Sequence, residues 1–482
     1  MEPLVFLDDS GNGYLYSPYK KKMIYLYRAL YSAIEYCLHC LKPVDELLCS
    51  DSFILSLDNK TKQDISFLYN HGFLTDTTED YSDNQIQYDF DCHYSDVKQY
   101  CFELTQKCNL QCTYCCYVDL YEHEGNDHTK EMSADNAYVL IDTICEDYQN
   151  RYGNSVLKNI TIGFYGGEPL LRMDLLKSIV QYCECRSKSI NNLRFSYIIT
   201  TNGILLQRYI NFLIKHNFMI MVSLDGNYEN SAFRTTSMGK NVFNTVFKNL
   251  CYINDHYSAF FDKNITFNSV VHSKNSPTEI VDFFYKSFKK IPQLSEIASE
   301  QIKQGSLAEF RNVYKPICIN CKDFNGIIPQ TEYLHVDKEM KNIPHFFYKL
   351  LDMNIADWSD LFCIIQNSQP FNICLPFVNK VFISADGKLH LCEHIGYGYS
   401  FGYIDLESKK IILNIDFMNR ISKEYISKQL EKCNQCYNSL FCEQCVFQCH
   451  FNCSSVTKEQ FLSIIAHNIE LLRKRSLFVK YQ

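Results

Sequence analysis

The chain lacks the long apolar runs that a membrane-spanning or secreted protein needs. None of its 482 residues belongs to a run of about 18 consecutive apolar positions, and no apolar segment follows a basic start. An excess of positive charge is also missing, because 55 acidic residues outnumber 47 basic ones and give a formal net charge of −8. A general nucleic-acid binder is normally basic. We therefore expect a cytoplasmic protein, with neither membrane nor nucleic acid among its partners.

Tryptophan is nearly absent, whereas cysteine is abundant. The chain has one tryptophan, Trp358, which we expect in the core, and 24 cysteines. In a short secreted chain so many cysteines would indicate disulfides. A long chain without a secretion signal favours thiolate ligands for metal instead. The length and a hydrophobic content of 46% are enough for two to four domains with a sizeable core.

Three cysteines stand close together in the run CNLQCTYCCY. Cys108, Cys112 and Cys115 have the spacing Cys-x3-Cys-x2-Cys. A chain with 24 cysteines produces such a triplet by chance about 0.06 times, so the neighbouring residues matter. Three thiolates in one loop can hold three corners of a [4Fe–4S] cluster, and the fourth iron then stays open for a substrate or cofactor.

Three further motifs follow, each closing an apolar run with the pattern of a strand. Glycines at a strand end let the backbone approach a ligand closely, and a carboxylate there can accept a hydrogen bond from an ammonium group. Arg234 lies nine residues after Asp225. The candidate ligand-binding residues are Gly166, Gly167, Glu168, Pro169, Thr201, Asn202, Ser223, Asp225 and Arg234.

In this order, the cysteine triplet and the later motifs resemble the radical S-adenosylmethionine (SAM) enzymes. The resemblance implies that the three cysteines hold a [4Fe–4S] cluster whose open iron binds SAM. It places Tyr114 against the SAM adenine, Glu168 at the methionyl amino group and Arg234 at the methionyl carboxylate. It also implies cleavage of SAM to a 5′-deoxyadenosyl radical, which abstracts hydrogen from an unactivated carbon.

Strand-like and helix-like segments alternate between about residues 98 and 290. This alternation predicts a parallel α/β sheet with ligands at the carboxyl ends of its strands, where the motifs lie. The resemblance implies a partial (β/α)6 TIM-like barrel. The expected strands are 160–164, 195–200, 220–224 and 265–271, and the expected helices are 134–147, 174–185, 204–216 and 242–254.

A second group of cysteines occupies residues 374–453. Cys374 and Cys392 flank a strand, an Asp-Gly turn and a return strand, which would bring the two thiols near each other. Six more cysteines follow: Cys433, Cys436, Cys442, Cys445, Cys449 and Cys453. Eight thiolates suffice for two four-iron clusters, although paired CxxC units also suit zinc. The spacing resembles the SPASM extension of radical SAM enzymes, which implies two auxiliary [4Fe–4S] clusters.

That resemblance also implies how the eight cysteines divide. Cys374, Cys392 and one later cysteine would hold the first auxiliary cluster. Cys433, Cys436, Cys442 and Cys453 would hold the second. The chain departs from the usual SPASM spacing after Cys442, so the bridge back to the first cluster could come from Cys445 or Cys449.

Other candidate ligands have ordinary alternatives. His390 and His394 flank Cys392, but we expect them in the core or in solvent. Cys318 and Cys321 form a CxxC that could reach a cluster, although such pairs in a cysteine-rich chain are more often unligated. In total, the resemblance implies three iron–sulfur clusters and an oxygen-poor cytoplasm.

The first 95 residues contain none of these motifs. Residues 11–26 have the pattern of a hairpin, and helix-like stretches follow at 29–41 and 62–69, with Cys37 and Cys40 on a core-facing side. A small hairpin with helices resembles the peptide-recognition modules of peptide-modifying radical SAM enzymes, in which a leader peptide adds a strand to a sheet edge. A structural extension is the alternative.

These patterns predict five parts. They are a leader-recognition-like domain at 1–95, a radical SAM core at 96–295, a bridging region at 296–370, a SPASM domain at 371–455 and a C-terminal helix at 456–482. SPASM enzymes mostly act on peptides. The resulting hypothesis is a maturase that installs a thioether, carbon–carbon or carbon–oxygen cross-link in a ribosomally made precursor, with flavodoxin or ferredoxin as electron donor.

Two other functions are open to the sequence. An anaerobic sulfatase-maturing enzyme, which makes formylglycine, is the first. Those enzymes carry an aspartate directly after the hairpin cysteine as a base, whereas Glu393 stands there in this chain. A non-catalytic partner with a degenerate radical SAM fold is the second, and the intact cysteine triplet argues against it.

Overall fold

The computed structural model describes most of the chain as two compact units. The described residues are 2–7, 11–17, 22–40, 42–74, 93–117, 120–121, 129–153, 155–298, 302–316, 326–327, 376–377, 379–393, 397–433, 436–437 and 457–462. The first unit comprises Met1–Gln87, Pro329–Asn372 and Lys423–Gln482. The second comprises Tyr88–Ile328 and Ile373–Ser422.

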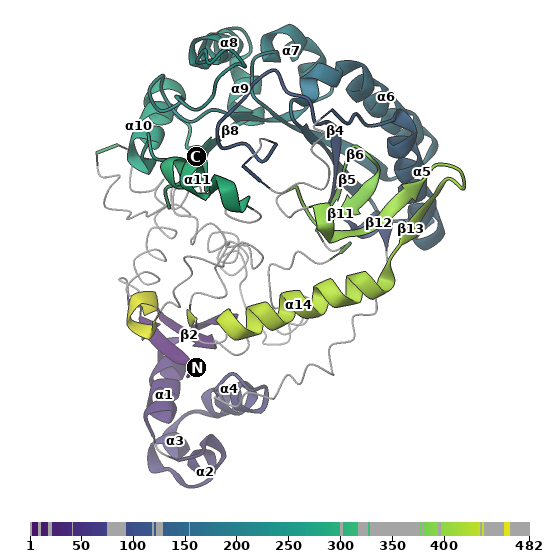
Figure 1. The fold of residues 1–482 in the computed structure, drawn as a ribbon. Helices are drawn as coiled ribbons and strands as arrows, with labels where there is room; N and C mark the ends of the chain where they lie inside the picture. Colours follow the sequence, from purple (N-terminus) through teal and green to yellow (C-terminus); the bar gives the residue numbers. More distant parts are fainter. Residues whose placement is uncertain are drawn as a thin grey trace. The chain divides into compact units, whose positions relative to one another are not determined.

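The first unit contains a three-stranded antiparallel sheet in the order β1-β2-β3, followed by four helices (Figure 1). These elements are β1 (Leu4–Leu7), β2 (Gly13–Ser17), β3 (Lys22–Leu26), α1 (Arg28–His39), α2 (Val44–Ser50), α3 (Ser52–Ser56) and α4 (Asn59–Asn70). The expected hairpin and both expected helices are present, whereas β1 was not expected. Helix α1 buries Leu30, Ala33, Ile34 and Cys37, a spacing that puts one apolar stripe against the core.

Chain segments from the far C-terminus belong to the same unit. The hydroxyl of Tyr16 on β2 donates to the backbone oxygen of Tyr437 at 2.8 Å. The Tyr16 ring also stacks on Phe461, with 4.8 Å between ring centroids. The sheet of the N-terminal residues therefore packs against residues that follow Cys436.

The second unit is built on a ten-stranded sheet in the order β13-β12-β11-β10-β4-β5-β6-β7-β8-β9. Its parallel strands are β4 (Gln99–Thr105), β5 (Lys158–Gly166), β6 (Leu193–Thr201), β7 (Met219–Ser223), β8 (Ile265–Val270) and β9 (Gln293–Ser295). They are neighbours in chain order, with at least one helix between successive strands up to β9. The expected α/β class with a parallel sheet is confirmed.

Figure 1 shows the helices of this unit around the outside of the curved sheet. They are α5 (Ala134–Tyr152), α6 (Met173–Ser189), α7 (Leu206–Lys215), α8 (Phe243–His256), α9 (Ser258–Asn264) and α10 (Pro277–Phe288). A shorter helix, α11 (Leu307–Val313), comes after β9. In the part of the chain that the structure describes, no helix is both long and apolar enough to cross a membrane.

The expected hairpin around the Asp386-Gly387 turn extends the same sheet. Strand β10 (Lys380–Ile383) pairs in parallel with β4, so it continues the barrel beyond the first strand of the core. The strands β11 (Lys388–His390), β12 (Ser400–Asp405) and β13 (Lys410–Leu413) then follow in antiparallel order, and α14 (Ile415–Cys433) comes after them. This direct pairing was not expected from the sequence.

The two faces of β4 differ in chemistry. Tyr100, Phe102 and Leu104 are fully buried apolar side chains on one face. Cys101 and Glu103 alternate with them, so their side chains point to the other face of the strand. The residues of β5 and β10 that pair with these two lie on that same face. One face of β4 therefore carries the Cys101 thiol and the Glu103 carboxyl just before the cysteine loop.

Candidate cluster and cofactor site

The cysteine triplet lies in the loop that begins where β4 ends. Cys108 is exposed, Cys115 is half-buried and Cys112 is buried. The Cys108 sulfur accepts hydrogen bonds from Leu110 N at 3.4 Å and from Asn202 Nδ2 at 3.7 Å. Donors of this kind stabilise a thiolate and tune a cluster bound to it. The loop therefore presents three thiols, one of them with two donors already in place.

A second chain segment holds the loop in shape. Gln111 N donates to Thr235 O at 2.7 Å, and Thr113 N donates to Phe233 O at 3.2 Å. These bonds clamp the loop on both sides of Cys112. The buried side chains of Cys112 and Tyr114 also pack in an apolar cluster with Ile297, which follows β9, and with Phe310 and Val313 of α11. Sequence patterns in the bridging region gave no sign of this cover.

The glycines after β5 are required by a close approach of two backbones. Gly167 N donates to Thr105 O at 2.8 Å, next to the cysteine loop. A Cβ on Gly166, whose φ is +131°, would lie 2.1 Å from Thr105 O. A Cβ on Gly167 would lie 2.3 Å from Lys107 O. Only glycine lets the end of β5 reach the start of the loop.

Glu168 connects the ends of β5 and β6. Its carboxylate is fully buried and accepts from Leu170 N at 3.0 Å, Thr201 Oγ1 at 2.8 Å and Asn202 N at 2.7 Å. Burial raises the pKa of Glu168 to about 7, although the three hydrogen bonds oppose this. Both oxygens thus face protein donors. The expected contact with a methionyl amino group stays a prediction for this residue.

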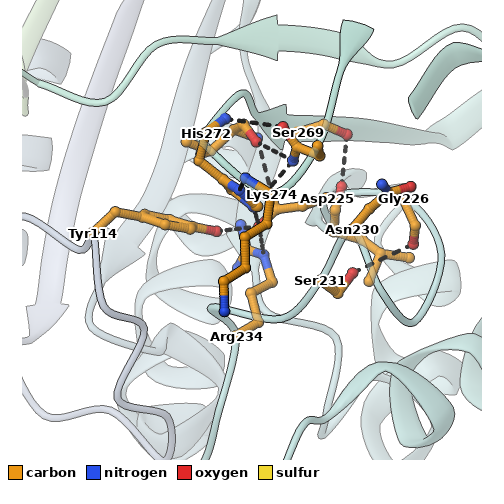
Figure 2. A network of polar contacts seen from close by, with 12 residues as sticks. Tyr114, Asp225, Gly226, Asn230, Ser231, Arg234, Ser269, His272 and Lys274 are labelled. Atoms are coloured by element: carbon orange, nitrogen blue, oxygen red, sulfur yellow. Dashed lines mark hydrogen bonds and ion pairs between the residues drawn. The ribbon is translucent and has the colours of Figure 1, made fainter. Parts of the chain in front are cut away.

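Asp225 is the centre of a buried network that reaches the cysteine loop (Figure 2). It accepts a hydrogen bond from the hydroxyl of Tyr114, and its Oδ2 lies 3.1 Å from Arg234 Nε and 3.7 Å from His272 Nε2. Val270 N donates to Oδ1 at 3.0 Å. The structure therefore brings together three of the expected residues, Tyr114, Asp225 and Arg234.

Electrostatics keep this network charged. Burial alone would raise the pKa of Asp225, but the Arg234 charge and the contacts with His272 and Tyr114 outweigh it and hold that pKa below its ordinary value. The Arg234 guanidinium also lies over the Tyr114 ring, 5.6 Å from its centroid. The cation and the aromatic ring next to Cys112 are thus positioned by one carboxylate.

His272 is a member of this network that the sequence reasoning missed. It is fully buried, and its ring stacks on Tyr114 at 5.8 Å between centroids. Its Nδ1 accepts from Lys274 N at 3.2 Å, while Nε2 lies 3.0 Å from Asn275 Nδ2. The sequence offered one signal for His272, which is its position after the apolar segment of β8. The polar residues of the other motifs also follow the apolar segment of a strand.

The remaining expected residues have mixed positions. Ser223 is half-buried at the end of β7, and Pro169 begins the short 3-10 helix Pro169–Arg172. Cys392 is half-buried after β11, and Cys436 is buried in the first unit. Only the backbone of Cys433 is described. The residues outside the described part are His394, Trp358, Cys318, Cys321, Cys374, Cys442, Cys445, Cys449 and Cys453.

The donor set suits a cluster better than a single ion. Within the described ranges, no three histidine, cysteine or acidic side chains converge on one metal ion. A four-iron cluster makes no such demand, since each thiolate binds a different iron and the sulfurs lie further apart. The cysteines of the loop are free thiols, and burial raises the pKa of Cys112 to about 12, so a thiolate there needs a compensating cation such as iron. The residues present fit an iron–sulfur cluster.

Comparison with known families agrees with this geometry. The model of the radical SAM superfamily matches residues 102–284, and the SPASM iron–sulfur cluster-binding domain matches residues 374–437. The chain is 30% identical over 338 residues to an uncharacterized protein of Methanocaldococcus jannaschii, which covers 70% of this chain and 99% of that protein. The chain belongs to the radical SAM superfamily. It is an enzyme of the SPASM-bearing kind, with iron–sulfur clusters and SAM as its cofactors.

Two further similarities concern proteins of stated activity or ligand. The chain is 24% identical over 365 residues to the cysteine-type anaerobic sulfatase-maturating enzyme of Clostridium novyi, which covers 72% of this chain and 86% of that enzyme. The structure of SuiB from Streptococcus suis bound to its precursor peptide SuiA is similar with a TM-score of 0.37 and 16% identity, covering 82% of each chain.

Proposed function

We propose that this enzyme is a peptide maturase, which uses a 5′-deoxyadenosyl radical to cross-link residues of a ribosomally made precursor. The observation that carries the radical chemistry is the loop of Cys108, Cys112 and Cys115 at the carboxyl end of β4, clamped by the segment of Phe233 and Thr235. A four-iron cluster on these thiols would supply the electron that cleaves SAM. The chain itself would position SAM.

Specific residues would bind SAM at the carboxyl ends of the parallel strands, which form one rim of the sheet. Arg234, buried and held by Asp225, offers a cation for the methionyl carboxylate. Tyr114 offers an aromatic surface for the adenine. Gly166 and Gly167 would take part through their backbone, which lies against the start of the cysteine loop. The polar groups of Thr201, Asn202 and Ser223 and the Glu168–Pro169 element complete the proposed site.

For the second cysteine group we propose two auxiliary [4Fe–4S] clusters. Cys392 stands next to the barrel strands through the β10–β11 hairpin, which supports a cluster beside the radical site. The proposed ligands are Cys374, Cys392, Cys433, Cys436, Cys442, Cys445, Cys449 and Cys453. A cytoplasmic flavodoxin or ferredoxin would be the electron donor.

The first unit supports a peptide as the substrate. It has its own buried core and a small antiparallel sheet whose outer strands are β1 and β3. A leader peptide could add a strand to such an edge, because the outer side of an edge strand can pair with the backbone of another chain. A relative that acts on sulfatases, which are themselves polypeptides, also supports this class of substrate.

Sulfatase maturation is the second candidate, and one contact disfavours it. The carboxylate after the hairpin cysteine would have to act as a base. Here Glu393 accepts from Lys380 Nζ at 2.5 and 2.7 Å, and the pair is largely buried. A carboxylate held by a buried lysine is a poor proton acceptor, since the cation stabilises its charged form.

The test is a reaction with a candidate precursor peptide, taken from any short open reading frame found beside this gene. The cluster-loaded enzyme, reduced under anaerobic conditions with SAM, should remove about two mass units from that peptide per cross-link. A triple variant with alanine at Cys108, Cys112 and Cys115 is the control and should give no product. If SAM is consumed while the peptide mass stays unchanged, cross-linking is wrong. If a sulfatase peptide gains formylglycine, the second candidate replaces the first.

A further inference from the structure

Glu103 is a fully buried carboxylate that contacts two cysteine-bearing segments. It lies near the end of β4, five residues before Cys108, and it is 0% exposed. A carboxylate in the interior needs several hydrogen-bond donors to replace its lost hydration. The identity of those donors shows what Glu103 connects.

One carboxylate oxygen faces the first cysteine loop. Tyr117, two residues after Cys115, donates its hydroxyl to Glu103 Oε1 at 2.6 Å. This bond is short for a hydroxyl–carboxyl contact, which makes it one of the stronger side-chain hydrogen bonds of the loop. It fixes the end of the loop that carries the third cysteine.

The other oxygen faces the β10–β11 hairpin. Ala385 N, in the turn of that hairpin, donates to Glu103 Oε2 at 2.8 Å, and Gln106 Nε2 lies 3.4 Å from the same oxygen. The contact joins residues 282 positions apart in the sequence. The hairpin leads directly into Cys392, so the second contact of Glu103 reaches the other cysteine system.

The local geometry of β4 directs Glu103 to both partners. The pairing of β4 with β5 is regular up to Glu103 and shifts between Glu103 and Thr105. Irregularities of this kind bend a strand and change the direction of a side chain, and they are common beside active sites. The shift lies at the point where the strand turns into the cysteine loop.

We propose that Glu103 is a positioning residue that fixes the separation between the cluster on the first loop and the auxiliary cluster held by Cys392. The proposal rests on the cluster assignment made above. Magnetic coupling and electron exchange between two clusters both fall steeply with distance. A single carboxylate bonded to both supports would keep that distance constant through the catalytic cycle.

The first test uses protein without clusters. In Glu103→Leu, the Tyr117 hydroxyl and the buried Ala385 N lose the acceptor that Glu103 provides. Amide hydrogen exchange should rise about tenfold in both segments, 108–117 and 384–392, and stay unchanged in strands β6 to β8. Glu103→Gln keeps one acceptor oxygen and should restore most of the protection. Lys130→Met is the matched control, because it removes only the ion pair between the Lys130 side chain and Asp386 of the same turn, at 3.0 Å, and keeps the backbone bond from Gln106 N to Lys130 O.

The second test uses cluster-loaded, reduced protein. The spin–spin broadening between the two clusters should change in Glu103→Leu and in Tyr117→Phe, and should match the wild type in Lys130→Met. An unchanged broadening in folded Glu103→Leu would overturn the proposal. So would increased exchange in only one of the two segments. If Glu103→Leu does not fold, Tyr117→Phe provides the same comparison, with Glu103→Gln as the conservative variant that should stay close to the wild type. Since the first test needs neither cluster nor peptide, its result is independent of the proposed function.

Discussion

Two buried carboxylates at the same rim of the sheet are stabilised in opposite ways. Glu168, at the ends of β5 and β6, accepts only from neutral donors, and its pKa is raised to about 7. Asp225, after β7, lies against the cation of Arg234, and its pKa is lowered. Both are fully buried. The difference teaches that burial does not decide the charge of a carboxylate here; the presence of a paired cation does.

The largest effect is expected from removing that cation. Arg234→Met leaves the Asp225 carboxylate buried without its counter-charge, which should lower the free energy of unfolding by about 3–5 kcal/mol. Urea denaturation of the cluster-free protein measures it. Arg186→Met is the matched control, because Arg186 pairs with Asp142 at 3.0 Å near the surface and should cost at most about 1 kcal/mol.

A double variant sharpens this result. In Arg234→Met with Asp225→Asn, no unpaired charge remains, so part of the lost stability should return. Equal losses in the single and double variants would show that Arg234 acts through packing against Tyr114 and not through Asp225.

The second prediction concerns the pH dependence of Glu168. Its folded pKa of about 7 exceeds the ordinary value of 4.5, so the folded state holds more protons than the unfolded state between these two values. Stability from this group is therefore present below pH 4.5 and lost as pH rises towards 7, by about 3 kcal/mol. Glu168→Gln has no such titration.

The measurement is the difference in unfolding free energy between wild type and Glu168→Gln at several pH values. The wild type should lose stability relative to the variant from pH 4.5 to 7.5. Glu146→Gln, on an exposed position of α5, provides the control and should show no comparable trend. A difference that does not vary with pH would mean that Glu168 stays ionised like Asp225, and the contrast between the two sites would fail.

The third prediction concerns the backbone next to Glu168 and does not involve charge. Gly166→Ala introduces a Cβ that would lie 2.1 Å from Thr105 O at a φ of +131°, and should destabilise by about 2–3 kcal/mol. Gly153→Ala also has a positive φ, +48°, but nothing within 4 Å of the new Cβ, and should cost about 1 kcal/mol. Thermal unfolding of both variants checks this order. Equal costs would show that the contact with Thr105 relaxes freely.

The sequence predicted the motifs of this rim better than their contacts. Glycines at a strand end indicate a close approach of the backbone to another group, so the role of Gly166 and Gly167 could be predicted from the sequence. The rotamer of Glu168 depends on donors from β6, which no local pattern reveals. His272 was missed for the same reason, since its partners Tyr114 and Asp225 are distant in sequence. The pairing of β10 with β4 joins strands about 280 residues apart, and such register is set by tertiary packing.

The smallest effect is expected where a carboxylate pairs with cations at the surface. Asp96 binds Arg151 at 2.5 Å and Lys158 at 2.6 Å, and its side chain is 34% exposed. Burial opposes ionisation, but Lys158, Tyr152 and Arg151 outweigh it and lower the pKa of Asp96. Its contribution is therefore present above pH 4 and lost as pH falls below that value.

Solvent screening limits that contribution, so Asp96→Asn should cost only about 1 kcal/mol at pH 7, and less in high salt. Thermal unfolding at pH 7 and pH 3 measures it, and the variant should differ from wild type less at pH 3 than at pH 7. This is the opposite sign to Glu168, whose cost appears only as pH rises. A loss at Asp96 as large as that of Arg234→Met would contradict the rule drawn from Glu168 and Asp225, because a partly exposed carboxylate keeps much of its hydration in the folded state.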